Sequence, residues 1–248
     1  MSAADRVRLS LVLDGVAALR QRRLASGPDP VAVALVAQQA GADGVTMRLR
    51  TDRAEIQDRD VDLVAQLLHT VLNLRIGVED SLIASAIRFR PARCCLVPEQ
   101  RHDHASGGGL DAARLHGRLG EARQRLYDAD IEVAARIDPE LDQIDACARA
   151  RLDAVELNCG AYALATSRDA VEKRLAALGA AARHAADAGL GVYAGGGLDY
   201  RNVTPVIAAA KIAELRIGHA ILADALIHGV AASLGRMLAL VAARHVGA

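Results

Sequence analysis

Two glycine-rich segments late in the chain have the composition of an anion-binding site. In the first, the apolar run Gly191-Val192-Tyr193-Ala194 ends in three consecutive glycines, Gly195-Gly196-Gly197, and a helical pattern follows. The second, Leu215-Arg216-Ile217-Gly218-His219-Ala220, repeats the order of apolar run, glycine and helix. Glycine lets backbone N–H groups face a ligand, and amides near a helix start bind anions. The two segments therefore predict a phosphate site, unless the glycines serve only to allow tight turns.

Charged residues occur where several apolar strands are expected to end. Arg48 and Arg50 share one face of such a strand, Asp14 ends another, and Arg75 and Glu156 lie in two more. Unpaired charge is costly to bury, so these side chains must face an open site or pair with each other. Arginines that face an open site predict an anion pocket, whereas pairing with glutamates predicts salt bridges at its rim.

The remaining candidates for chemistry are weaker. His102 and His104 have the spacing of metal ligands, but no third ligand accompanies them, so we expect no metal ion. Cys159 lies near Glu156, but no histidine neighbours it in sequence, so we expect a core thiol rather than a nucleophile. We also expect no cofactor.

Composition narrows the class of partner. The 248 residues carry 30 basic and 30 acidic side chains, and aromatic residues make up only 2% of the chain. Balanced charge and few aromatic rings disfavour a nucleic-acid or membrane-surface partner. Residues 1–8 lack an apolar signal core, and every apolar run is too short to cross a bilayer. We therefore expect a cytoplasmic protein with reduced cysteines that binds a small molecule.

The elements that position these residues alternate between strand and helix. Residues 18–29 are expected to form a loop, after which Pro28-Asp29-Pro30 opens a helix. The expected strands are 8–14, 45–50, 72–78, 93–97, 131–137, 154–158, 191–194 and 214–217, and the expected helices are 30–39, 60–70, 80–90, 111–129, 139–149, 169–188, 203–210 and a closing helix to about 244. This order predicts one α/β domain over residues 1–248, a (β/α)8 TIM barrel, with an open doubly wound sheet as the alternative.

Five segments have the sequence and spacing of a known family: Pro28-Asp29-Pro30, Ala40-Gly41-Ala42-Asp43-Gly44, Cys94-Cys95-Leu96-Val97-Pro98-Glu99, Gly108-Gly109-Leu110-Asp111 and Ile217-Gly218-His219-Ala220-Ile221. With them the whole chain resembles pyridoxine 5'-phosphate synthase, which condenses 1-deoxyxylulose 5-phosphate with 3-amino-2-oxopropyl phosphate in vitamin B6 synthesis. The resemblance implies a (β/α)8 barrel with extra helices that assembles as a homo-octamer.

The resemblance also implies roles for residues that this chain retains. One group would bind the phosphate of the aminooxopropyl substrate: Arg23, Gly197, Gly218 and His219. A second group would bind 1-deoxyxylulose 5-phosphate: Asp14 and Arg50. Glu156 remains as the candidate catalytic residue.

The family's three proton-transfer groups are replaced in this chain. The family's histidine base corresponds to Arg48, its glutamate base to Arg75 and its histidine acid to Gly196. Positions of substrate contacts also differ, at Val12, Glu55 and Ala105. One positioned acid or base contributes about 10²–10⁴-fold to a rate, and arginine stays protonated and cannot act as a base. We therefore expect the family condensation to be lost or altered.

Three interpretations remain open. In the first, the chain binds a small phosphorylated metabolite, and Arg48 and Arg75 join the retained arginines around a second anionic group. In the second, it is a working synthase in which Glu55, Glu156 or His104 substitutes for the missing groups. In the third, it is a non-catalytic structural or regulatory homologue that assembles with itself or with an active paralogue, and its arginines pair with glutamates across the mouth.

Overall fold

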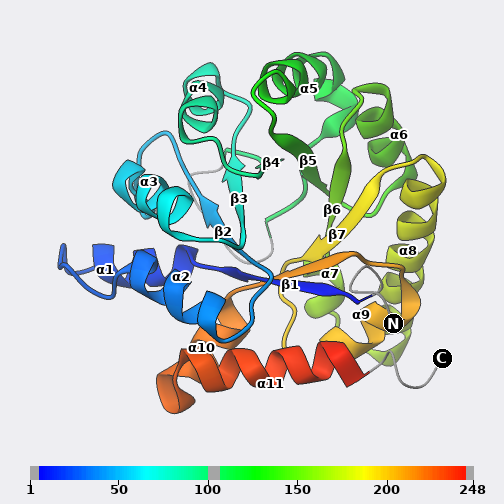
Figure 1. Cartoon of the computed structure of the whole chain (residues 1–248). Helices are drawn as coiled ribbons and strands as arrows, with labels where there is room; N and C mark the ends of the chain where they lie inside the picture. Colours follow the sequence, from blue (N-terminus) through cyan, green and yellow to red (C-terminus); the bar gives the residue numbers. More distant parts are fainter. Residues whose placement is uncertain (1–5, 100–106, 244–248) are drawn as a thin grey trace.

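The computed structural model describes residues 6–99 and 107–243, in which eight parallel strands close into a barrel (Figure 1). Each strand pairs with the next, and the last pairs with the first. The strands are β1 (Arg8–Val12), β2 (Gly44–Arg48), β3 (Val71–Ile76), β4 (Arg93–Leu96), β5 (Glu132–Ile137), β6 (Ala154–Asn158), β7 (Gly191–Gly195) and β8 (Glu214–Ile217). The predicted (β/α)8 barrel is confirmed, and the open sheet is wrong.

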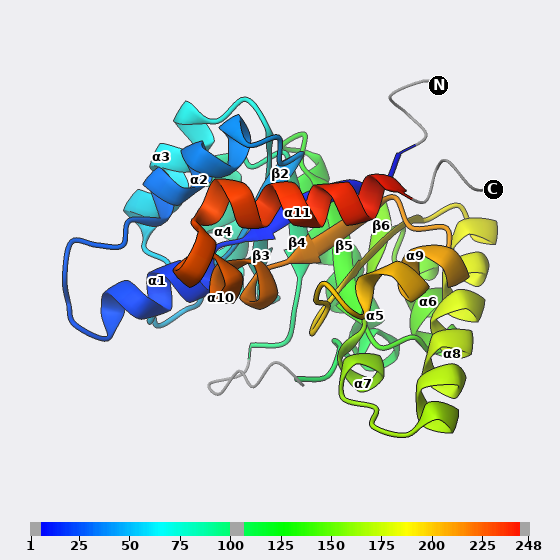
Figure 2. The same cartoon turned by 90° about the horizontal axis from the view of Figure 1, so that it is seen from below.

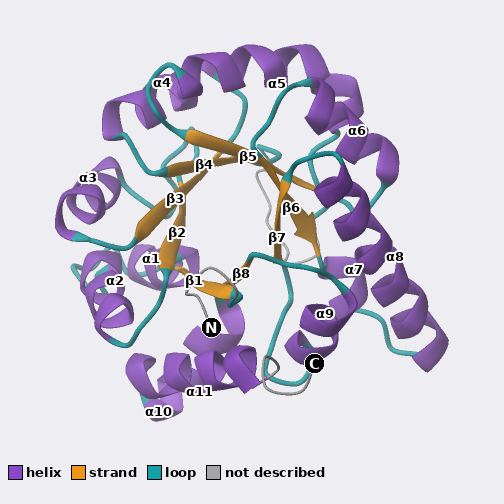
Figure 3. Cartoon of the chain, turned by 45° about the vertical axis from the view of Figure 1, so that its right-hand side comes forward, coloured by secondary structure: helices purple, strands orange, loops and turns teal. Residues whose placement is uncertain are grey.

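Helices form a ring around the strands, as Figure 3 shows. They are α1 (Asp14–Gln21), α2 (Pro30–Gln39), α3 (Asp58–Leu67), α4 (Asp80–Phe89), α5 (Ala112–Tyr127), α6 (Leu141–Arg149), α7 (Gly160–Ala163), α8 (Arg168–Asp187), α9 (Val203–Ala209), α10 (His219–His228) and α11 (Val230–Ala242). Two helices follow each of β1, β6 and β8, so the barrel carries extra helices. Among the described residues, no helix combines the length and apolar character that a bilayer crossing demands.

Local sequence explains where the helices begin and end. Pro30 occupies the first turn of α2, and the Asp29 side chain accepts a hydrogen bond from the Val31 amide at 3.0 Å, as the motif predicts. The closing helix expected after β8 is in fact two helices. Gly229 separates them with a φ of 80°, a conformation that favours glycine.

The loop expected over residues 18–29 is partly wrong, because α1 extends to Gln21. One face of α1 buries Val16 and Ala17, and Arg20 extends from the same helix to Asp60. The Arg20 guanidinium donates two hydrogen bonds to the Asp60 carboxylate, at 2.8 and 2.6 Å. Arg20 falls within this expected loop, but its bidentate pair with Asp60 holds it in the interior.

Alternate residues of each strand face opposite sides of the barrel wall. Apolar side chains such as Leu11, Met47 and Leu74 are fully buried in the main core, which the helices cover. The other face fills the barrel interior and is unusually polar. There the Ser10 and Thr46 hydroxyls lie 2.8 Å apart, and Asn73 donates to Thr46 at 3.2 Å. The interior therefore accepts polar and charged side chains as long as they have partners.

The helices that follow β1 and β8 lie at one side of the barrel mouth. Figure 2 shows α1 beside α10, with α11 running along the barrel next to them. These helices present apolar side chains toward the carboxyl-terminal ends of the strands, where a cavity lies.

Candidate functional site

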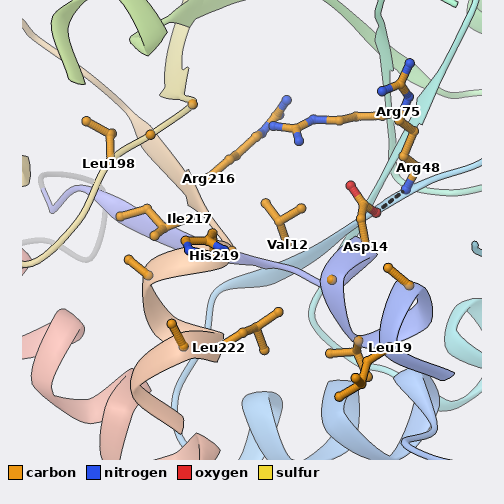
Figure 4. A pocket seen from close by; sticks show the side chains of 18 of the residues that line it. Val12, Asp14, Leu19, Arg48, Arg75, Leu198, Arg216, Ile217, His219 and Leu222 are labelled. Atoms are coloured by element: carbon orange, nitrogen blue, oxygen red, sulfur yellow. Dashed lines mark hydrogen bonds between the residues drawn. The ribbon is translucent and has the colours of Figure 1, made fainter. Parts of the chain in front are cut away.

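A cavity of about 780 Å³ opens at the carboxyl-terminal ends of the strands, the usual place for a site in this fold. One of its walls is apolar and comes from the helices that flank β1 and β8: Leu19, Val33, Leu222, Leu226 and Val230. The other wall is charged. Arg48, Arg75, Arg136 and Arg216 come from the strands, and Asp14 is the first residue of α1. Figure 4 shows Arg75 and Arg216 extending toward each other above Val12.

Glu156 of β6 lies beneath the arginines and is fully buried. Its carboxylate accepts a hydrogen bond from Arg75 at 2.5 Å and another from Arg216 at 2.7 Å, and Arg136 lies 3.9 Å away. Burial raises the pKa of Glu156, but the positive charges of the three arginines outweigh burial and hold it at about 2. A carboxylate with so low a pKa is a weak proton acceptor at neutral pH.

Arg136 of β5 is held in place by Asn158. Its guanidinium donates to the Asn158 side-chain oxygen at 2.8 Å, and the Asn158 amide donates to Asp138 at 2.8 Å. Burial lowers the pKa of Arg136, and the nearby charge of Arg75 lowers it further. Arg136 remains protonated, because guanidinium does not deprotonate in proteins.

Gly196 makes room for this arrangement. A Cβ at this position would lie 2.7 Å from the Arg136 guanidinium and 2.8 Å from the Asn158 oxygen, and the backbone has a φ of +98°. Any larger side chain at 196 would therefore displace Arg136. The histidine that the family resemblance implies at 196 and an arginine in the observed position at 136 exclude each other.

Asp14 and Arg48 connect β1 to β2 at the charged wall. The Asp14 carboxylate accepts a hydrogen bond from the Arg48 backbone amide at 2.7 Å, drawn as a dashed line in Figure 4. Burial raises the pKa of Asp14, although Arg75 and Arg48 both oppose this shift. The Arg48 guanidinium donates to the Pro98 carbonyl at 2.7 Å, and burial lowers its pKa.

The two glycine turns face the same cavity. Gly197 has a φ of +71°, and Gly218 immediately precedes α10, whose first residue is His219. No side chain within residues 6–99 and 107–243 caps the start of α10. A Cβ at Gly218 would lie 2.9 Å from the Val12 carbonyl, so glycine is required for this close approach. Backbone amides at this helix start are available to bind an anion.

The predicted site residues do not all meet in the cavity. Those that line it are Asp14, Arg48, Arg75, Gly197, Gly218 and His219. Three others are absent from its lining as far as the described residues go: Arg23, Arg50 and Glu156. Arg23 is exposed after α1, Arg50 pairs with Asp52 at 3.0 Å, and Glu156 is covered by arginines. Arg22 lines the cavity instead of Arg23.

Two arginines of the charged wall, Arg136 and Arg216, were not predicted. Their sequence signal is the one that identified Arg48, a charge at an alternate position of an apolar strand. Of the weaker candidates, Cys159 is a buried thiol whose pKa burial raises to about 12, as expected for a core residue. His102 and His104 lie outside the described residues. Within the described ranges, no group of three or more His, Cys, Asp or Glu side chains could hold a metal ion.

Comparison with protein families gives a match over residues 9–243 to the family described as "Pyridoxal phosphate biosynthesis protein PdxJ". Curated relatives carry the name pyridoxine 5'-phosphate synthase. The one from Magnetococcus marinus is 42% identical over 231 residues, which span 93% of this chain and 95% of the relative. The one from Pseudoalteromonas translucida is 44% identical over 224 residues, 90% of this chain and 92% of the relative.

Solved structures share the fold at low sequence identity. Thiamine phosphate pyrophosphorylase from Pyrococcus furiosus superposes with a TM-score of 0.63 at 15% identity, over 97% of this chain and 98% of that one. Phosphoribosylanthranilate isomerase from Thermotoga maritima gives 0.60 at 13% identity, over 95% and 98% of the two chains. At such identity the likeness establishes the barrel fold alone.

Proposed function

The chain belongs to the PdxJ family of pyridoxal phosphate biosynthesis proteins, and from this membership we propose that it is a diverged barrel that binds a small phosphorylated metabolite at its mouth. The family condensation of 1-deoxyxylulose 5-phosphate with 3-amino-2-oxopropyl phosphate is lost or altered in it. The observation that carries the proposal is the charged wall of the cavity, which consists of guanidinium groups and the carboxyl of Asp14.

The proposed phosphate position lies above the two glycine turns. Gly197 and Gly218 bring backbone close to the cavity, and the uncapped start of α10 offers amides and the positive end of its dipole. His219, the first residue of α10, supplies a side chain beside them. Together these groups support binding of a phosphate monoester.

The proposed loss of the condensation follows from the kinds of side chain that face the cavity. The reaction requires repeated proton transfers, and guanidinium groups at 48 and 75 cannot accept protons. Glu156 is fully buried and has a pKa of about 2, which weakens the support for the catalytic role predicted for it. Asp14 is the protonatable side chain of the charged wall that remains, and burial raises its pKa. One such group does not replace the three proton-transfer groups that the family resemblance implies.

The second candidate function is a working pyridoxine 5'-phosphate synthase with substitute acid–base groups. The 42–44% identity to relatives of that name favours it. Glu55 is its best substitute base: burial, followed by the charge of Asp14, raises its pKa. Against it, Glu55 does not line the cavity in the described structure.

We also propose that the chain assembles as a homo-oligomer, as the family resemblance implies. Support comes from α10, where Leu226 and Ile227 are 81% and 79% exposed. Two adjacent large apolar side chains at such exposure are unfavourable in an isolated barrel. Light scattering after size exclusion tests this: an octamer or smaller oligomer is expected, and a monomer at micromolar concentration contradicts it.

The proposal is tested with two assays on the purified protein. With both family substrates present, we expect no pyridoxine 5'-phosphate above the rate without protein. In calorimetry, glycerol 3-phosphate as a probe monoester should bind, and His219→Ala should weaken this binding at least several-fold. His228→Ala, at the other end of α10, is the matched control and should bind normally. Rapid product formation would establish the second candidate instead, and absence of any binding would leave the third, structural interpretation.

A further inference from the structure

Four arginines contribute to the cavity lining, more than the nearby carboxylates balance. Arg48, Arg75, Arg136 and Arg216 line it together. Two carboxylates lie close enough to interact with more than one of these arginines. The charge of Asp14 interacts with Arg48 and Arg75, and the charge of Glu156 interacts with Arg75, Arg136 and Arg216. Glu99 acts on Arg48, and Glu214 bonds Arg216 but also bonds Arg8 and Arg93. The charged wall therefore carries excess positive charge in a partly buried setting.

Several donors of these arginines are also unused. Arg75 Nε, Arg136 Nε and Arg216 Nη2 are buried and have no hydrogen-bond partner among residues 6–99 and 107–243. The side chains of Arg75 and Arg136 are 8% and 18% exposed and so reach the cavity, whereas the side chain of Arg216 is 0% exposed and does not. Buried donors without acceptors are rare because each is costly, and clustered like charges add repulsion. Both observations indicate that an acceptor with negative charge belongs here.

The arginines are fixed in place before any ligand arrives. Arg216 is held between Glu156 at 2.7 Å and Glu214 at 3.1 Å, Arg75 by Glu156, and Arg136 by Asn158. Guanidinium groups that are already oriented lose little conformational entropy when they bind an oxyanion. Residue 196 lacks a side chain, so Arg136 keeps its place.

We propose that Arg75 and Arg136 form a second anion subsite, and that the ligand is a phosphate ester bearing a second oxyanion, a carboxylate or another phosphate. This assignment rests on the proposed function, in which the first phosphate lies over Gly197 and Gly218. The apolar wall with Leu19 and Leu222 faces the carbon skeleton that joins the two groups. The cavity volume of about 780 Å³ accommodates a small metabolite of this kind.

Crystals of the wild-type protein soaked in inorganic phosphate separate the two subsites. We expect one phosphate over the Gly197 and Gly218 turns and another within hydrogen-bond distance of Arg75 and Arg136. A phosphate over the turns alone overturns the second subsite and leaves the proposed function standing. A phosphate at the arginines alone supports the subsite and contradicts the proposed phosphate position, and empty density at both contradicts both.

Calorimetry in solution tests the ligand class. The probes are glycerol 3-phosphate, with one anionic group, 3-phosphoglycerate, with an added carboxylate, and glycerol 1,3-bisphosphate, with an added phosphate. The wild type should bind at least one of the doubly anionic probes tenfold or more tightly than glycerol 3-phosphate, and the better probe identifies the second group.

Two variants test whether the arginines cause the tighter binding of the doubly anionic probes. Arg136→Gln should abolish the preference for the doubly anionic probes while glycerol 3-phosphate binding changes less than threefold. Arg168→Gln, which removes an arginine 89% exposed on α8, is the matched control and should keep the preference. Equal wild-type affinity for all three probes, or a preference that survives in Arg136→Gln, overturns the second subsite.

Discussion

The two ends of the barrel interior both contain charged side chains, and they differ in how those charges are balanced. At the amino-terminal end, Arg8, Arg93, Glu132 and Glu214 come from four different strands. Arg93 donates to Glu132 at 2.9 Å and to Glu214 at 2.6 Å, and Arg8 approaches Glu214 at 3.4 Å. Each acid meets a base, and Tyr193 donates a further hydrogen bond to Glu132.

At the carboxyl-terminal end, the balance shifts to positive charge. Arg48, Arg75 and Arg136 surround a cavity, and buried donors of the last two remain unpaired among the described residues. Arg216 joins the two ends, because it bonds Glu214 below and Glu156 above. The neutral end is suited to stability and the cationic end to ligand binding. In this fold, functional sites usually lie at the carboxyl-terminal end and stabilising contacts at the amino-terminal end.

The largest effect on stability is expected from removing the charge of Glu156, which lies between the two ends of the barrel interior. Glu156→Gln leaves three buried guanidinium groups facing each other without their counter-charge. Breaking a buried ion pair costs about 3–5 kcal/mol, and we expect a loss of that size in urea unfolding. Asp52→Asn, which breaks the more exposed Arg50 pair, should cost at most about 1 kcal/mol. Similar losses in the two variants would contradict the central role of Glu156.

The contribution of Glu156 to the free energy of unfolding should depend on pH. The pKa of Glu156 falls from 4.5 to about 2 on folding, so the native state holds this proton less tightly than the unfolded chain does. The resulting stability is fully present above pH 4.5 and is lost as pH falls toward 2, by about 3 kcal/mol. The difference in unfolding free energy between wild type and Glu156→Gln should therefore shrink over this range. A difference independent of pH would show that Glu156 titrates normally.

Substitutions at the amino-terminal end of the barrel interior should change stability without changing ligand binding. Arg93→Gln leaves Glu132 and Glu214 with fewer donors, and we expect a loss of about 2 kcal/mol in urea unfolding. Phosphate-ester affinity should stay within twofold of wild type. Arg136→Gln should behave in the opposite way, with weakened binding of doubly anionic probes and little loss of stability. If both variants change binding equally, the two ends are not functionally distinct.

The smallest effect concerns the space shared by residues 136 and 196. Gly196→Ala should destabilise the wild type, because the new Cβ meets the Arg136 guanidinium and the backbone is left-handed. In an Arg136→Ala background the backbone strain and the close approach to Asn158 remain but the contact with Arg136 is gone, so the cost should fall by about 1 kcal/mol in a double-mutant cycle. An unchanged cost would indicate that Arg136 moves aside freely. Placing at 196 the histidine that the family resemblance implies should accordingly require a smaller residue at 136 as well.

The fold was predictable from sequence because its signals are local and repeated. Apolar runs of strand length alternate with helical patterns, and stops such as Ala40-Gly41-Ala42-Asp43-Gly44 mark the change. The errors arose where a distant contact or the conformation of a single residue overrides the local pattern. Arg20 belongs to a helix because Asp60, 40 residues away, binds it, and Gly229 divides the last helix by its conformation.

The location of the site and its positive charge were predictable from the sequence, but the residues that form it were only partly predictable. Glycine turns and strand-end arginines identified the mouth, and Asp14, Arg48 and Arg75 do line the cavity. Arg50 points away from the cavity and pairs with Asp52. It lies beyond the end of β2, where side chains no longer alternate between the two faces of the strand. Arg136 and Arg216 carry the same strand signal as Arg48. Which guanidinium groups meet depends on pairing between distant strands, which one sequence does not show.

The most direct test of the account is the rate at which the wild-type protein forms pyridoxine 5'-phosphate from the two family substrates. The Magnetococcus marinus relative, assayed at equal concentration, provides the reference. With guanidinium groups in place of proton acceptors, the account predicts a rate at least about 10⁴-fold lower, the contribution of two or more positioned acid–base groups. A rate within tenfold of the relative would contradict it.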